Sequence, residues 1–217
     1  KTIHNGVELH KFQNENPRSF ERGLILYIGT LIRKKGVFEL PEIFNKVRKQ
    51  YPDSRLVLIG NDASDNITKS KSTWKVLKSK FKVEDLQKVF YLGKIPYDEV
   101  QEWIVNANVC VFPSFAETFG MVTIEAMALK KAVVTSNFGW TAEIIDDNAN
   151  GFLVNPKNHQ EFATKIATLL SDDELTNEFT KSARRKVEQN FDIKNIAMQN
   201  IDFYKETIDS FKIKTQE

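Results

Sequence analysis

Two glutamates flank a stretch that is predicted to begin a helix, and their spacing suits the binding of one extended ligand. Glu117 lies in the loop after an apolar strand, and Glu125 follows beyond Phe119 and Gly120. If the helix begins near Phe119 or Gly120, its rise of about 1.5 Å per residue sets the two carboxylates on the order of 10 Å apart. The unpaired amides of residues 119–121 would face an anion between them. The pattern predicts a ligand with hydroxyl groups at both ends and negative charge in its middle.

A glycine-bounded turn with three adjacent cations is the second motif with binding chemistry. The turn contains Gly29, Thr30, Arg33, Lys34, Lys35 and Gly36. It is predicted to open a helix, whose N-terminus is suited to phosphate. The turn matches neither a GxGxxG loop nor a Walker loop, so a solvated basic turn is the alternative interpretation.

Each glutamate also has a purely structural alternative, and the two alternatives differ. Glu117 could simply be an acidic residue that the helix dipole favours in the first turn. Glu125 lies among apolar neighbours, where a carboxylate without a partner is costly, so a bound or bonded partner is expected for it.

Six short runs rich in Val, Ile, Leu and Phe predict the buried strands that must position these motifs. They cover residues 24–29, 55–60, 88–92, 109–113, 132–136 and 152–154. Segments with helical periodicity lie between them, and one apolar face is formed by Tyr97, Val100, Trp103, Ile104 and Ala107. Strands that alternate with amphipathic helices pair in parallel, because each crossover helix covers a face of the sheet. We therefore predict an α/β fold with a doubly wound, parallel, six-stranded, Rossmann-like sheet, in which ligands bind at the carboxyl ends of the strands.

The rest of the chain is divided by its polarity and periodicity. Three C-terminal helices are predicted near residues 158–171, 172–189 and 193–214. The last two start at Asp172-Asp173 and Asp192, which are suited to N-caps. Residues 1–22 predict an entry linker between domains, residues 23–192 the Rossmann-like domain, and residues 193–217 a C-terminal helix that packs toward a further domain. The lysine-rich stretch 61–82 is interpreted as a solvated helix face, with an anionic membrane or glycan contact as the alternative.

The composition of the chain gives no reason to expect binding to nucleic acid or to a metal ion. The 31 lysines and arginines nearly balance 29 acidic residues, and the net charge of +2 does not predict binding to nucleic acid. His4, His10 and His159 form no local ligand cluster, so they are expected at surface or linker positions and no metal site is predicted. The single cysteine, Cys110, is expected in the core. We find no run long enough to span a bilayer and no leader, and expect a soluble, cytoplasmic chain.

The ordered set of motifs resembles the retaining glycosyltransferases of family 4, which have the GT-B fold of two Rossmann-like domains. The family signature is two glutamates separated by seven residues, and Glu117 and Glu125 reproduce it together with Pro113-Ser114, Phe119-Gly120 and Ala126-Met127-Ala128. Further matching segments are His4 to Glu8, Leu26 to Gly29, Lys35-Gly36, Leu58 to Gly60, Tyr91 to Pro96, Ser136, Gly139, Glu143 to Ile145 and Asn150 to Val154. The chain is similar to the C-terminal, donor-binding half of such an enzyme.

The resemblance implies roles for the matching residues. Lys35 contacts the donor diphosphate, Glu125 binds ribose hydroxyls, and Glu117 approaches the transferred sugar, so Glu117 and Lys35 are the catalytic candidates. The donor-binding candidates are Gly29, Thr30, Arg33, Lys35, Gly93, Lys94, Phe119, Gly120, Met121 and Glu125. The resemblance also implies transfer of a sugar from a nucleoside diphosphate sugar with retained anomeric configuration, without a cofactor or a required metal. Lys35 and the helix amides would stabilise charge that grows on the leaving diphosphate.

The resemblance also implies partners that this chain does not contain. In that family the acceptor half precedes the donor half, so we expect a missing N-terminal acceptor domain, a glycan or lipid-linked acceptor, and no transfer by this piece alone. The expected setting is bacterial surface-polysaccharide assembly, in the cytoplasm or at the inner face of the membrane through the missing domain. The alternatives are a GT-B-like sugar-nucleotide epimerase and a flavodoxin-like binding or regulatory module without enzymatic activity.

A few residues depart from the family pattern. Thr30 stands where the family often has arginine, and Arg33 is a candidate substitute. Lys130 and Ala132 replace the usual glycine and proline, and Trp140 replaces a second glycine. Trp140 either walls the sugar pocket or fills a gap in the packing. These departures bear on the identity of the donor.

Overall fold

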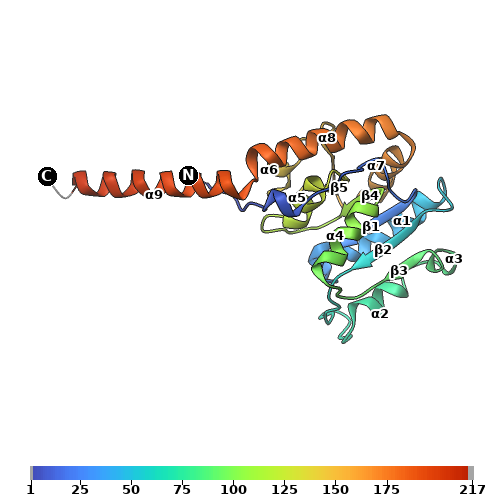
Figure 1. The fold of residues 1–217 in the computed structure, drawn as a ribbon. Helices are drawn as coiled ribbons and strands as arrows, with labels where there is room; N and C mark the ends of the chain where they lie inside the picture. Colours follow the sequence, from blue (N-terminus) through green and yellow to red (C-terminus); the bar gives the residue numbers. More distant parts are fainter. Residues whose placement is uncertain (1, 215–217) are drawn as a thin grey trace.

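A single parallel sheet organises the residues that the computed structural model describes, which are 2–214 (Figure 1). Its strands are β1 (Leu24–Ile28), β2 (Arg55–Ile59), β3 (Val89–Tyr91), β4 (Val109–Phe112), β5 (Ala132–Ser136) and β6 (Phe152–Val154). They are ordered β3-β2-β1-β4-β5-β6 and every neighbouring pair is parallel. This confirms the predicted doubly wound, six-stranded sheet, and each predicted strand is found at its predicted place.

Helices follow the strands and cover both faces of the sheet. They are α1 (Leu40–Arg48), α2 (Thr73–Lys78), α3 (Val83–Leu86), α4 (Tyr97–Asn106), α5 (Met121–Ala128), α6 (Thr141–Ile144), α7 (His159–Ser171), α8 (Asp173–Asn190) and α9 (Ile193–Lys214), with short 3-10 turns η1 (Leu9–Lys11), η2 (Arg33–Lys35) and η3 (Val37–Glu39). The three predicted C-terminal helices are confirmed as α7, α8 and α9. Asp172 caps α8 by accepting a hydrogen bond from the Leu175 amide at 2.9 Å, as its residue type predicts.

The alternation of side chains along each strand divides the core into two clusters. Ile25 and Tyr27 of β1 point into one cluster with α1 and α7, whereas Leu24 and Leu26 point into the other with α4 and α5. Helix α8 contributes to both clusters. Cys110 of β4 is fully buried in the second cluster, as expected from its apolar run. Because each fully buried aliphatic side chain contributes roughly 1.5–3 kcal/mol, these two layers hold the sheet rigid beneath its loops.

The described part of the entry segment, residues 2–22, packs against the second face. Val7 pairs with the junction of α8 and α9 through hydrogen bonds with Phe191 and Ile193, at 2.8 and 3.0 Å. The ring of Phe12 is buried, and Arg184 of α8 donates to the carbonyl oxygens of Phe12 and Ala128. This segment therefore contributes side chains to the core of the domain that follows it.

Three local predictions differ from the structure. The lysine-rich stretch is not one helix, since only α2 is helical and a loop held by carboxylates of Asp62 and Asp65 precedes it. Tyr97 is not on the buried face of α4, because it stands in the first turn and half of its surface is exposed. The basic turn does not open an α-helix directly, since η2 and η3 intervene before α1.

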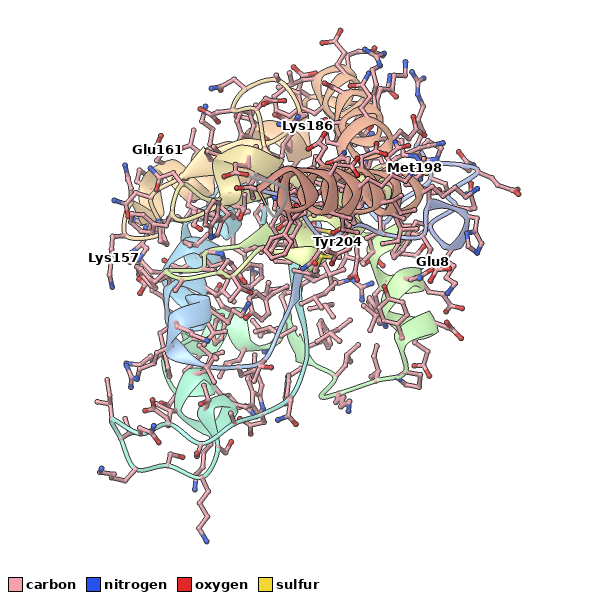
Figure 2. The ribbon with its side chains drawn as sticks, turned by 90° about the vertical axis from the view of Figure 1, so that its left-hand side faces the viewer. Glu8, Lys157, Glu161, Lys186, Met198 and Tyr204 are labelled. Atoms are coloured by element: carbon pink, nitrogen blue, oxygen red, sulfur yellow. The ribbon has the colours of Figure 1, made fainter. Side chains whose placement is uncertain are left out.

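Helix α9 extends away from the body of the domain (Figure 1). Figure 2 looks toward this helix from its free end and labels Met198 and Tyr204 on it. Both side chains are more than half exposed, and Ile201 and Ile208 are also exposed. Within residues 2–214, no helix combines the length and apolarity that a membrane span needs.

Candidate functional site

The strand order reverses between β1 and β4, and the two chemical motifs follow these strands. β1 pairs with β2 on one side and with β4 on the other, so the loops after β1 and β4 leave the same edge of the sheet next to each other. The Phe115 amide donates to the Lys34 carbonyl oxygen at 2.8 Å, which joins the two loops directly. The two motifs therefore meet at the carboxyl edge of the sheet, where the sequence predicts that ligands bind.

Gly36 permits this close approach. Its φ of +69° lies in the left-handed region, and a Cβ atom there would lie 1.7 Å from the carbonyl oxygen of Pro113. A side chain at this position would push the basic turn away from the loop after β4. The absence of a side chain is what lets Lys35, one residue earlier, reach Glu117.

Lys35 and Glu117 form an ion pair at the centre of the site. The Lys35 Nζ atom lies 2.6 Å from each carboxylate oxygen of Glu117, and the Ser114 hydroxyl donates to Oε1 at 2.9 Å. Both charged side chains are largely buried, with 26% and 16% of their surfaces exposed. Behind them, burial and the charge of Glu117 raise the pKa of Tyr27, so that its hydroxyl stays neutral. The two catalytic candidates thus hold each other in place.

Helix α5 presents its N-terminus beside this ion pair. Gly120 caps the helix in the left-handed conformation, with φ of +81°, and Met121 is the first helical residue. This places the helix start within one residue of the prediction. The Thr123 amide donates to the Gly120 carbonyl oxygen at 2.9 Å, whereas the amides that precede it have no acceptor within the helix and carry its positive end. An anion bound here would be met by these amides and by the Lys35 ammonium.

Glu125 lies one turn further along α5 and has the partner that its apolar neighbours require. The Tyr97 hydroxyl donates to Oε1 of Glu125 at 2.8 Å. Burial raises the pKa of Glu125, while the hydrogen bond from Tyr97 opposes this shift. Tyr97 was not predicted as a site residue, although its position after the carboxyl end of β3 places it at the same edge.

The remaining donor-binding candidates occupy different surroundings. Gly29 follows β1 and donates to the Ile59 carbonyl oxygen at 2.9 Å, and Thr30 is the next residue in the same loop. Gly93 lies after β3 with no atom within 4 Å of where its Cβ would be, and Lys94 beside it is exposed. These residues follow β1 and β3 at the carboxyl edge of the sheet.

Arg33 is held by a residue that the sequence did not suggest. Its guanidinium makes two hydrogen bonds to the Asp65 carboxylate, at 2.6 and 2.7 Å, and stacks over Phe38 at 4.4 Å. The ion pair with Arg33 and hydrogen bonds from Thr68 hold the pKa of Asp65 well below its usual range. Arg33 therefore fastens the lysine-rich loop to the basic turn.

Aromatic side chains surround the start of α5. His4 stacks on Phe119 with 5.0 Å between ring centroids, and its Nε2 atom lies 2.9 Å from a carboxylate oxygen of Glu143. His4 was expected at a linker or surface position, and this long-range contact has no local sequence signal. Trp140 has 48% of its surface exposed, so it does not fill a packing gap. In the part of the chain that the structure describes, no group of three or more metal-ligating side chains is gathered.

Comparisons with known proteins agree with this geometry. The family model described as glycosyl transferases group 1 matches residues 10–186. The capsular polysaccharide biosynthesis glycosyltransferase CapM of Staphylococcus aureus is 28% identical over 195 residues, which cover 86% of this chain and 49% of CapM. The chain spans about half the length of the curated relatives it matches.

Solved structures show the same fold. The C-terminal domain of the glycosyl transferase group 1 family protein LpcC of Francisella tularensis is 29% identical, with a TM-score of 0.74 over 87% of this chain and 100% of that chain. HepE of Anabaena, solved in complex with UDP-glucose, is 23% identical, with a TM-score of 0.81 over 95% of this chain and 57% of HepE. At that identity the likeness to HepE is one of fold.

Proposed function

The chain belongs to the group 1 glycosyl transferases, and we propose that it is the donor-binding half of a retaining hexosyltransferase. The observation that carries the proposal is the pair of carboxylates on either side of the α5 N-terminus, with the Lys35 ammonium between the two loops. A nucleoside diphosphate sugar has hydroxyls at both ends and two phosphates between them. The UDP-glucose ligand of HepE, a protein of the same fold, supports this class of donor.

The proposed binding mode assigns one part of the donor to each group. Lys35 and the first-turn amides of α5, near Phe119 and Gly120, contact the diphosphate. Glu125 accepts hydrogen bonds from the ribose hydroxyls, and Glu117 lies toward the transferred sugar. As the glycosidic bond breaks, negative charge grows on the diphosphate, where the ammonium and the helix amides stabilise it. In this arrangement no metal is needed to balance the leaving group.

Glu117 has a second task in this mechanism. Because both oxygens of Glu117 accept from the Lys35 ammonium, and the Ser114 hydroxyl donates to the Glu117 carboxylate, the cation is already positioned before a donor arrives. An ordered cation loses little conformational entropy when the diphosphate binds, which favours the transition state. Glu117 is therefore proposed to orient Lys35 as well as to approach the sugar.

The acceptor is proposed to bind outside this chain. The relatives are about twice as long, and an N-terminal domain of the same protein would supply the acceptor site across a cleft. We propose that the exposed apolar residues of α9 pack toward that domain and that this chain alone does not transfer sugar. The likeness to CapM supports a glycan or lipid-linked acceptor in bacterial surface-polysaccharide assembly. A lipid-linked acceptor would place the protein at the inner face of the membrane.

Calorimetric titration tests donor binding. The chain is titrated with UDP, GDP and their common sugar conjugates, and the titration is repeated with Glu125→Gln and Lys35→Met. We expect saturable binding of one nucleotide class, weakened at least tenfold in both variants, since each removes a charge-assisted hydrogen bond of about 1.5–3 kcal/mol. Glu178→Gln and Lys49→Met, which change exposed residues of the same types, serve as matched controls.

The outcomes separate the hypotheses. Equal binding by Glu125→Gln and Glu178→Gln would overturn the assignment of Glu125 to the ribose. Binding of no nucleotide by the folded chain would favour a regulatory module. A sugar-nucleotide epimerase would bind the donor and convert the bound sugar to its epimer, which product analysis detects.

A further inference from the structure

A cleft of about 210 Å³ opens at the opposite edge of the sheet from Glu117 and Glu125. It lies where β1, β4 and β5 begin, and it is closed by residues 17–22 and by the first turns of α8. Because the strands are parallel, their amino ends share this edge and their carboxyl ends share the other. The cleft and the proposed donor site are therefore separated by the length of the strands.

Two buried donors line the floor of the cleft without an acceptor. Lys131, the residue before β5, is 2% exposed, and its Nζ atom has no hydrogen-bond partner among residues 2–214. Asn108, the residue before β4, is also 2% exposed. Its Oδ1 atom accepts a hydrogen bond from the Gly23 amide at 3.0 Å, whereas its Nδ2 atom is unpartnered in the described part of the chain. Two such groups are costly unless an acceptor reaches them.

Among residues 2–214, no acidic side chain forms an ion pair with Lys131. Its ammonium lies 5.4 Å from the centroid of the Phe20 ring. Burial lowers the pKa of Lys131 to about 8, the shift expected of a cation removed from water without a carboxylate beside it. The ammonium is thus charged at neutral pH and would be stabilised by an anion.

The mouth of the cleft adds further charge and an apolar surface. Four cationic and two acidic side chains line the cleft: Arg18, Arg22, Lys130, Lys131, Asp173 and Glu174. Arg22 is already paired with Asp173, with 2.9 Å between one nitrogen and one oxygen. The Phe20 ring forms part of the wall. A ligand here would meet excess positive charge at the floor and carboxylates at the rim.

We propose that this cleft binds a small phosphate ester of a sugar or polyol, with the phosphate on Lys131 and Asn108. A phosphate has three acceptor oxygens for the ammonium and the amide. Its carbon chain fits against the Phe20 ring, and its hydroxyls donate to Asp173 and Glu174. The volume exceeds what one inorganic ion fills, which favours an ester over a free anion. This site is independent of the proposed donor site.

Titration with inorganic phosphate, glycerol 3-phosphate and glucose 6-phosphate at constant ionic strength tests the proposal. We expect saturable binding at one site per chain, with an ester at least tenfold tighter than inorganic phosphate. Lys131→Met keeps the shape of the side chain without its charge and should weaken ester binding at least tenfold. Asn108→Asp keeps the acceptor for the Gly23 amide but places a carboxylate against the phosphate. It should also weaken ester binding at least tenfold.

Two controls assign the binding to this cleft. Glu125→Gln, at the other edge of the sheet, and the exposed Lys49→Met should both leave ester binding unchanged. Ester binding that survives both Lys131→Met and Asn108→Asp in folded protein would overturn the proposal. Loss of binding in Glu125→Gln would place the ester in the donor site, and equal affinity for ester and inorganic phosphate would overturn the ester assignment.

Discussion

At the carboxyl edge of the sheet the charged residues of the candidate site are paired, whereas at the amino edge a buried lysine is not. Lys35 holds Glu117, Arg33 holds Asp65, and Tyr97 donates to Glu125. Lys131, at the amino edge, is as deeply buried as any of these and has no acceptor in the described structure. Both edges belong to the same rigid sheet, so the difference lies in the loops that each edge supports.

The polar groups at a binding edge can be either paired or unpaired before a ligand binds. Paired groups keep their geometry without a ligand, and a donor must then share or replace the existing partners. Unpaired buried groups lower the stability of the folded chain, and a ligand that pairs with them restores it. Mutations at the two edges should therefore change stability in opposite directions.

Gly36→Ala should have the largest effect, because it breaks the geometry on which the paired edge depends. The new Cβ atom would lie 1.7 Å from the Pro113 carbonyl oxygen, in a backbone conformation that disfavours side chains. We expect the free energy of unfolding in urea to fall by roughly 4 kcal/mol, and nucleotide binding to be lost with the contact between Lys35 and Glu117.

Gly93→Ala is the matched control for this prediction. Gly93 also has a left-handed φ, of +72°, but its Cβ would enter open space. The free energy of unfolding of Gly93→Ala should therefore fall only by the cost of a side chain in the left-handed conformation, about 1–2 kcal/mol. Equal losses in the two variants would show that the contact with Pro113 does not matter.

Lys131→Met should raise stability, which is the opposite effect at the opposite edge. Burial lowers the pKa of Lys131 from 10.5 to about 8, so the unfolded chain binds more protons between these values. The penalty is complete below pH 8 and disappears as the pH rises toward 10.5. We expect the variant to be more stable at pH 7 by up to about 3 kcal/mol, and the gain to vanish near pH 10.5 in urea unfolding. A gain that is the same at both pH values would contradict an ionic origin.

Tyr97→Phe should have the smallest effect and sharpens the assignment of Glu125. Burial raises the pKa of Glu125, and removal of the hydroxyl takes away the hydrogen bond that opposes this rise. Protonated Glu125 no longer accepts strong hydrogen bonds, so nucleotide binding should fail at a higher pH in the variant. We expect the acid midpoint of nucleotide binding to shift upward, because the hydrogen bond from Tyr97 lowers the pKa of Glu125.

Calorimetry across a pH series measures that midpoint, with Tyr204→Phe on α9 as the control. Coincident midpoints for the two variants would remove Tyr97 from the site.

The sheet was predictable because its signals are local. Each strand is a short apolar run, and the residues that follow β1 and β4 meet wherever a doubly wound sheet reverses its order. The start of α5 was predictable for the same reason, since Gly120 marks it in the sequence. The family signature then assigned roles to residues that this topology brings together.

The pairing of the side chains was not predictable, because it depends on contacts between distant segments. Arg33 was a candidate for the donor, but Asp65 lies 32 positions away in a stretch interpreted as a solvated helix face or an anionic membrane or glycan contact. His4 and Phe119 meet because residues 2–22 return to the domain and pack on it. The amino-edge cleft gathers residues from four segments, none of which carries a motif.

Cys110 makes the centre of this sheet open to kinetic measurement. It is the only cysteine of the chain, it lies in β4 between β1 and β5, and burial raises its pKa to about 12. A thiol reagent therefore cannot react until the central strand is exposed and the thiol reaches water. The rate of labelling reports how often the core unfolds enough to expose the thiol. It can be measured with a ligand bound at either edge of the sheet. The labelling rate of Cys110 therefore reports the effect of a ligand at either of two sites that do not touch.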